Sequence, residues 1–197
     1  MTTVQEGITR ALRYLSVVNE GHPAPAAYES DIGLQALKAL YVQLVTGGRF
    51  GPITDVAVTA AYTAGENERI ADLSGVAVAV TLPASVVDAV TGLSRAVEDR
   101  SVVQIVGGST WIYDTGQGAW VDTQAITLAS QLPLGHRFMT ALAALLAVVV
   151  APELGVSAPE TVVTLAESGR AQLRAKKPIR VSVDTAMLRG LAQIRTI

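Results

Sequence analysis

The sequence contains no cysteine, and this absence removes several classes of protein from consideration. A chain without cysteine has no disulfide framework, no thiol nucleophile and no cysteine-based metal site. The N-terminus, MTTVQEGITRALRYL, also lacks the basic-then-apolar pattern of a signal peptide. Both features suit a cytoplasmic origin.

Histidine is almost as scarce, and no catalytic pattern is visible. His22 and His136 have no partner at metal-ligand spacing such as HExxH. The carboxylate pairs Glu66/Glu68 and Glu98/Asp99 lie in expected loops beside arginines, and we interpret them as solvated charge. Gly107-Gly108-Ser109 matches neither a phosphate loop nor a nucleophile elbow. The sequence therefore predicts a protein that is not an enzyme and has no cofactor and no metal site.

The most apolar run is too short to cross a membrane. Phe138 to Ala151 gives 14 uncharged residues, whereas a transmembrane helix needs about 20. Alanine and leucine dominate the first half of this run, and both are strong helix formers. We predict a helix over residues 134–151, buried on nearly all sides, with Pro152 forcing its end and no membrane as partner.

Helical periodicity predicts three further helices, over residues 3–18, 28–46 and 158–175. In the first, Arg10 and Arg13 lie away from the apolar face.

The expected helix ends carry matching signals. Thr2 or Thr3 is placed to cap the first helix, and Gly47-Gly48 ends the second. Ser157 with Glu160 three residues later matches a capping box for the last helix.

Between residues 53 and 132 the pattern becomes that of β-strands. Short strands are expected at residues 56–60, 69–73 and 76–82, and a loop or short helix at 84–92. The clearest part is a three-strand meander over residues 101–106, 109–114 and 119–123. Gly107-Gly108 makes its first turn, and residues 115–118 make its second.

The second turn predicts which side chains share a face. If residues 115–118 form the loop, Asp114 faces Ala119 and Tyr113 faces Trp120. Trp111, Tyr113 and Trp120 then form one aromatic face, which is a candidate interface. The opposite face is assigned to the core because it is aliphatic and β-branched: Val103, Ile105, Ile112 and Val121. The alternative is that both faces belong to the core.

Charge is divided unevenly along the chain. Residues up to Gly169 include 8 basic and 16 acidic side chains, a net of −8, whereas those from Arg170 onward include 7 basic side chains and Asp184, a net of +6. The basic end is also partly apolar, so we predict a docking arm over residues 176–197, with a solvated tail as the alternative. Its candidate contact residues are Lys176, Lys177, Ile179, Arg180, Val181, Val183, Met187, Leu188 and Leu191.

The predicted fold class is α+β. Four helices form one unit, residues 1–50 and 133–175, and an antiparallel β insertion, residues 51–132, interrupts it between the second and third helices. The extended C-terminal arm, residues 176–197, follows the last helix.

This order of elements resembles that of a known protein family. The stretches ITRALRYLSV (8–17), IGLQALKALYVQLVTGG (32–48) and FMTALAALLAVVVAPELGVSAPETVVTLAESGRAQLR (138–174) are similar to helices of the head-to-tail connector proteins of tailed bacteriophages and gene transfer agents. These proteins are also called adaptors or head-completion proteins. The buried helix of the family ends in Ala-Pro, as at Ala151-Pro152. The insertion of about 80 residues departs from the shortest members.

The resemblance implies a structural protein of a virion or gene transfer agent particle, assembled in the bacterial cytoplasm. Such adaptors form a ring beneath the portal, usually twelve-fold, which extends the DNA channel and provides the tail attachment site. The implied partners are the portal protein, a tail or stopper protein and further copies of the chain. DNA passes without specific binding, which an acidic body favours because phosphate contacts would retard it. Residues 176–197 are the implied portal-docking element.

Two other functions remain open. A nucleic-acid-binding regulator would use the basic arm and bind DNA in a salt-dependent manner. A β module that binds protein or carbohydrate would use Trp111, Tyr113 and Trp120.

Overall fold

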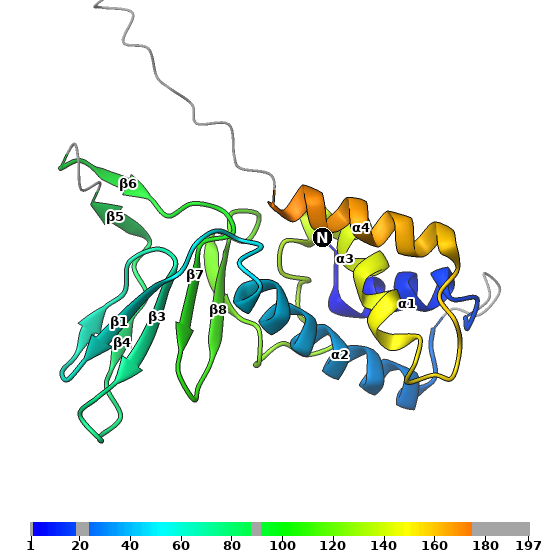
Figure 1. Cartoon of the computed structure of the whole chain (residues 1–197), viewed down its shortest axis with the longest axis horizontal. Coiled ribbons are helices and arrows are strands. Elements are labelled where there is room, and N and C mark those ends of the chain that lie inside the picture. The colour runs from blue at the N-terminus through cyan, green and yellow to red at the C-terminus, as the bar shows by residue number, and fades with distance from the viewer. Residues whose placement is uncertain (1, 19–23, 88–91, 175–197) are drawn as a thin grey trace, which may run out of the picture.

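In the computed structural model, the described residues 2–18, 24–87 and 92–174 form an α+β fold (Figure 1). Four helices gather on one side and the strands on the other. The helices are α1 (Val4–Tyr14), α2 (Ala27–Thr46), α3 (Gly135–Val150) and α4 (Glu160–Arg174). The strands are β1 (Thr54–Val58), β2 (Tyr62–Thr63), β3 (Glu68–Asp72), β4 (Val80–Thr81), β5 (Ser85–Val87), β6 (Ser94–Ala96), β7 (Val102–Ile105), β8 (Thr110–Asp114) and β9 (Ala119–Asp122).

Helix α3 lies at the centre of the helical part and packs against α1, α2 and α4. Every residue from Ala141 to Ala147 is buried. The predicted helix, buried on nearly all sides and ending before Pro152, is therefore confirmed. Neighbouring helices approach it closely because small residues lie at the contacts. A Cβ at Gly169 of α4, for example, would lie 2.8 Å from the Cβ of Ala141.

The helix ends follow local chemistry more closely than periodicity. Thr3 caps α1 through a reciprocal capping box with Glu6, as predicted. The helix ends at Tyr14, earlier than expected, because Ser16 adopts a left-handed φ of 57°. Helix α4 begins at Glu160, and the carbonyl of Pro159 accepts its first backbone hydrogen bonds. The predicted start at residue 158 is thus two residues too early.

The main sheet is mixed, with strand order β1-β3-β7-β8-β9. Strands β1, β3 and β7 are parallel, whereas β7, β8 and β9 form the predicted antiparallel meander. The prediction of an antiparallel insertion is therefore wrong for half of the sheet. The alternation of apolar residues along a strand predicts which side chains share a face of the sheet. It does not predict whether the strand runs parallel or antiparallel to its neighbours, because that depends on long connections.

The segment between β3 and β7 also differs from expectation. Of the predicted strand over residues 76–82, only β4 is a strand, and it pairs with β2. The carboxylate of Asp72 accepts hydrogen bonds from the backbone amides of Ser74 and Val78, which holds residues 73–79 in a loop. The predicted loop or short helix over residues 84–92 contains β5, which forms a hairpin with β6.

Register decides which side chains share a face of the meander. Tyr113 pairs with Trp120 and Asp114 with Ala119, as predicted. The first hairpin has a three-residue loop, Val106 to Gly108, because the Ile105 amide donates to the Ser109 carbonyl. This shifts the register by one, so Val103 pairs with Trp111 instead of Ile112. Val103, and by alternation Ile105, therefore lie on the aromatic face, contrary to the prediction.

Both faces of the main sheet are apolar because both are covered. Val102 and Ile112 face the helices and join them in one main core. On the other side, Val58, Ile70 and Val103 form a second core, closed by the segment that contains β2 and β4. The helices and the meander thus share the main core, which fixes the sheet against α3.

Candidate functional site

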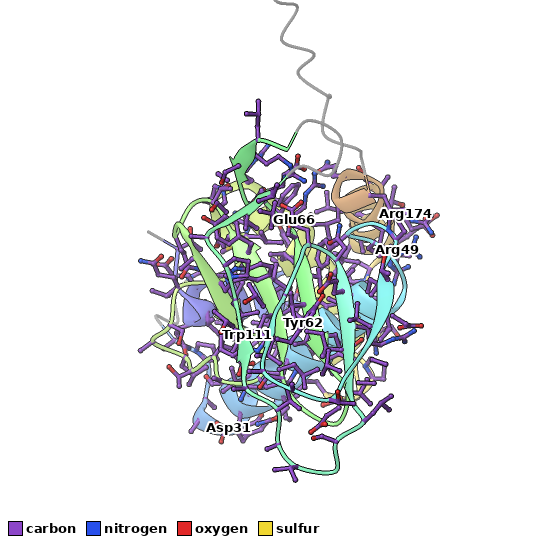
Figure 2. The ribbon with its side chains drawn as sticks, turned by 90° about the vertical axis from the view of Figure 1, so that its left-hand side faces the viewer. Asp31, Arg49, Tyr62, Glu66, Trp111 and Arg174 are labelled. Atoms are coloured by element: carbon purple, nitrogen blue, oxygen red, sulfur yellow. The ribbon has the colours of Figure 1, made fainter. Side chains whose placement is uncertain are left out.

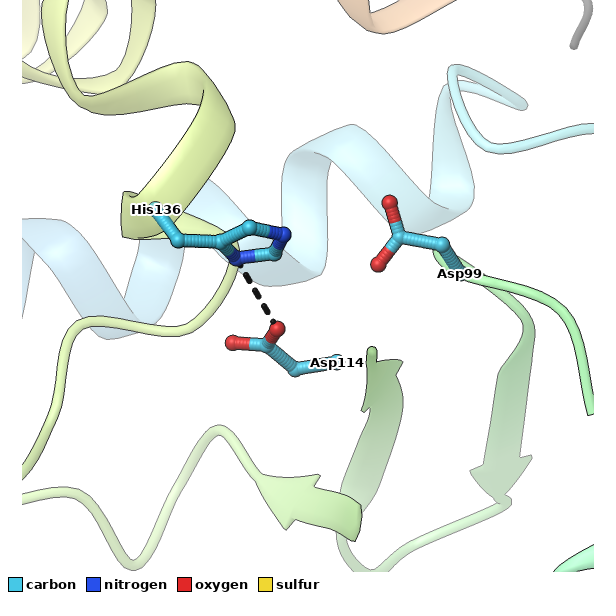
Figure 3. Close-up of side chains that lie close together, drawn as sticks. All are labelled: Asp99, Asp114 and His136. Atoms are coloured by element: carbon cyan, nitrogen blue, oxygen red, sulfur yellow. Dashed lines mark ion pairs between the residues drawn. The ribbon is translucent and has the colours of Figure 1, made fainter. Parts of the chain in front are cut away.

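A group of charged side chains lies where the main sheet meets the start of α3 (Figure 3). We call it the junction cluster: Asp99, Arg100, Asp114, His136 and Arg137. Asp99 and Arg100 precede β7, Asp114 ends β8, and the other two lie in the first turn of α3. Asp114 is 1% exposed and Asp99 is 5% exposed, so the site is built inside the protein.

Asp114 is the centre of the cluster. Its carboxylate accepts hydrogen bonds from the backbone amides of Gly116 and Leu134, both at 2.8 Å, and from the Gln117 side chain at 3.0 Å. Nδ1 of His136 lies 3.1 Å from Asp114 Oδ1. Such bonds to a charged acceptor are strong, so Asp114 fastens the β8–β9 turn to the first residues of α3.

Asp99 and the two arginines extend this connection to α4. Asp99 accepts from the Thr115 amide at 3.1 Å and from Arg137 at 3.3 Å. Arg100 donates to the carbonyl of Leu173, near the end of α4, at 2.8 Å. Both guanidinium groups lie over the ring of Phe138, at 5.4 and 5.8 Å from its centroid.

Burial shifts the proton equilibria around the cluster. It lowers the pKa of Arg100; the charges of Asp99 and Glu98 oppose this shift, while that of Arg137 adds to it. Burial also raises the pKa of Tyr41 well above its usual range, and the charge of Asp114 adds to this shift. Tyr41 is therefore a neutral donor at physiological pH, and its hydroxyl donates to the Pro133 carbonyl at 2.7 Å.

The junction cluster does not fit a metal ion, although its atoms are close together. Asp99, Asp114 and His136 each offer a ligand atom within 4.8 Å of the others. However, both oxygens of Asp114 already accept hydrogen bonds, and the carboxylate of Asp99 already accepts one from Arg137. The nearby guanidinium groups of Arg100 and Arg137 also repel a cation. The arrangement fits a structural junction between sheet and helices.

The aromatic residues predicted as an interface lie together on one face of the meander. The rings of Tyr113 and Trp120 make an edge contact at 5.5 Å. Trp111 and Trp120 pack against the second core, and Trp120 Nε1 donates to the Pro83 carbonyl at 2.8 Å. Figure 2 looks onto this side, with Trp111 and Tyr62 labelled. Much of the aromatic surface is thus used inside the chain.

The carboxylates interpreted as solvated charge make specific contacts instead. Glu66 accepts from Arg95, the Glu98 amide and Ser101, and Asp99 is buried in the junction cluster. Burial alone raises the pKa of Glu66, but these hydrogen bonds and the charge of Arg95 outweigh it, so its pKa lies below the ordinary value. The prediction is wrong for these two residues.

Sequence reasoning missed the junction cluster as a whole. One signal was present, because Asp114 starts the sequence Asp-Thr-Gly, which is typical of an Asx turn. No sequence signal joins Asp99, Asp114 and His136, which are far apart along the chain and meet only in the fold.

Two further predictions concern the rest of the chain. The predicted docking arm, Lys176 to Leu191 and onward to residue 197, lies outside the described residues, as does His22. Among the described residues, no helix is long and apolar enough to cross a membrane.

Comparison with known proteins adds no relative to this picture. No protein-family model matches the chain, and no curated protein matches it.

Proposed function

We propose that the chain is a structural head-to-tail adaptor of a phage or gene transfer agent particle. Copies of it form a ring under the portal, which extends the DNA channel and offers a surface to the tail or stopper protein. Helices α1 to α4 serve as the adaptor unit, with residues 51–132 inserted between α2 and α3. The arm of residues 176–197 docks on the portal.

The observation that supports this proposal best is the enclosure of α3. This helix carries no charge from Phe138 to Val150 and is surrounded by α1, α2 and α4. Helix α4 then runs back toward the sheet and ends at Arg174 (Figure 1). A rigid helical body that is followed in the sequence by a basic segment suits an adaptor that must be held by a larger ring.

The charge of the body favours a channel through which DNA moves. Up to Gly169 the net charge is −8, which disfavours lasting contacts with phosphates. The junction cluster and the shared main core keep the sheet in a fixed position relative to the helices. A channel wall under pressure from packaged DNA needs such rigidity.

Native mass measurement of the chain alone and with the portal protein of the same particle tests the proposal. We expect a complex with one ring of this chain per portal, and rings in electron micrographs. The absence of any complex with the portal would contradict the adaptor role. Salt-dependent binding of duplex DNA by the isolated chain would support the regulator instead.

A further inference from the structure

The outer face of α1 carries positive charge that the described part of the chain leaves unused. A groove of about 780 Å³ runs along this face, lined by Thr9, Arg10, Arg13 and Tyr14 of α1 and by Met139 of α3. Arg10 donates to the Tyr14 hydroxyl and lies over its ring, and neither arginine joins any ion pair among the described residues. Glu6 lies one turn earlier, where it caps α1.

The outer face of α4 carries the opposite pattern. Val162, Ala166, Gly169 and Leu173 turn inward, and one exposed side of the helix presents Glu160, Glu167, Arg170 and Arg174 to solvent. Within the described ranges these four charges also join no ion pair. Val163 lies beside them and is 37% exposed, which adds apolar surface to the face.

The directions of the two helices are compatible with a head-to-tail contact between copies. Helix α1 runs away from the sheet, whereas α4 runs back toward it, and both pack on α3 (Figure 1). Two copies standing side by side in the same orientation therefore bring α1 of one copy antiparallel to α4 of the next. Repetition of such a head-to-tail contact closes into a ring when the rotation between copies allows it.

The charges are complementary in that antiparallel arrangement. In such a contact Arg13 would face Glu160, Arg10 would face Glu167, and Glu6 would face Arg170. These positions span about 10.5 Å on α1 and about 15 Å on α4 at the helical rise per residue. The long arginine side chains cover the difference. Exposed ion pairs add little affinity each, so the pattern mainly selects partner and orientation.

We propose that the chain self-associates head to tail through this pair of surfaces. The α1 surface is Glu6, Arg10 and Arg13 with the groove beside them, and the α4 surface is Glu160, Val163, Glu167 and Arg170. The occupant of each surface is the other surface of a second copy. The inference rests on the ring of the proposed function, but it is tested by self-association and not by portal binding.

Charge reversal tests the pairing directly. The first variant carries Arg10→Glu and Arg13→Glu, and the second carries Glu160→Arg and Glu167→Arg. When two copies of the same variant meet, the changed side chains face charges of the same sign. In an equimolar mixture the two variants can alternate, and opposite charges then face each other at every contact. In sedimentation velocity at low salt, we expect the wild-type chain and the mixture to associate. Each variant alone should associate at least tenfold more weakly, and added salt should weaken the wild-type contact.

A matched control separates this pairing from a general effect of charge. Lys38→Glu with Arg49→Glu makes the same change in net charge as the first variant, but on and just after α2. This control should associate like the wild type, and circular dichroism should show all variants folded. Association of the first variant alone at wild-type strength would overturn the proposal, as would a mixture that stays monomeric.

The lack of cysteine allows a second test. Thr9→Cys on α1 and Thr164→Cys on α4 should form a disulfide between copies on mild oxidation. Thr164→Cys combined with Thr46→Cys, at the exposed end of α2, should form far less. A wild-type chain that is monomeric at low salt, with no excess of crosslink over this control, refutes the contact. Portal binding in that case would leave the adaptor role standing, and self-association without portal binding would remove only the adaptor role.

Discussion

At the scale of single residues, one carboxylate connects parts of the chain that are distant in sequence. Asp114 accepts hydrogen bonds from the β8–β9 turn and from the residue that precedes α3. A buried carboxylate with all its donors in place stabilises a single arrangement, and the loss of this acceptor leaves the buried donors unpaired.

Asp114→Asn should therefore lower the free energy of unfolding by about 2–4 kcal/mol, because the new amide nitrogen would face N–H donors. Urea denaturation followed by circular dichroism measures this loss. Asp122→Asn is the control, since Asp122 accepts from the Gln124 amide near the surface, and it should change stability by less than about 0.5 kcal/mol. Equal losses in both variants would contradict the role given to Asp114.

Glu66 should contribute to the acid sensitivity of the fold. Its pKa is lower in the folded chain than the ordinary 4.5, so the unfolded chain binds the proton more readily. The stability from Glu66 is complete above the unfolded pKa and is lost as pH falls through the folded pKa. Glu66→Gln should thus cost about 1–2 kcal/mol at pH 7 and markedly less at pH 3 in urea denaturation. A cost that is independent of pH would refute the assignment.

At the scale of elements, close contact between helices depends on small residues. Gly169 of α4 faces Ala141 of α3, and an added Cβ would lie 2.8 Å from the Ala141 Cβ and 3.0 Å from its Cα. The backbone of α3 at Ala141 cannot move away from an added Cβ unless the whole buried helix shifts.

Gly169→Ala should destabilise the fold by about 1–2 kcal/mol, even though alanine favours helices, because overpacking outweighs the gain in propensity. Ser168→Ala, one residue away on the exposed side of α4, should be neutral or slightly stabilising. Thermal unfolding compares the two variants. A higher melting temperature for Gly169→Ala would show that the helices are less tightly packed than the structure indicates.

The sheet changes our expectation for Trp120. If Trp120 served only as an interface residue, its substitution would change the stability of the monomer little. However, Trp120 packs on the second core, contacts the ring of Tyr113 and donates to the Pro83 carbonyl. We expect Trp120→Ala to lower stability by about 2–4 kcal/mol in urea denaturation. An unchanged monomer with lost assembly would restore the interface interpretation of the aromatic face.

At the scale of the whole molecule, an acidic body precedes a basic C-terminal segment. Among the described residues, which end at Arg174, two hydrophobic cores enclose α3 and cover both faces of the main sheet.

Deletion of residues 176–197 should therefore leave a folded protein that fails to join filled heads. Circular dichroism and thermal unfolding should match the full chain within a few degrees, while co-sedimentation with particles that contain portal should be lost. Normal occupancy of the truncated protein on heads would show that the arm is not the docking element.

Much of the fold follows from local pattern. The four helices, the meander and the Tyr113–Trp120 pairing were predictable because amphipathic periodicity, capping residues and turn residues act over a few neighbours. The parallel pairing of strands was not predictable, since strand direction depends on long connections. The face of the sheet on which Val103 lies was not predictable either, since the register depends on a single loop residue.

The sequence by itself determined the elements, the buried character of α3 and the division of charge between body and C-terminal segment. Only the tertiary structure decided that Asp99, Asp114 and His136 meet, that the aromatic face covers a second core, and which charges of α1 and α4 stay exposed. The reason is physical. Propensity and periodicity are summed over adjacent residues, whereas burial, ion pairing and the direction of a face arise when distant segments pack together.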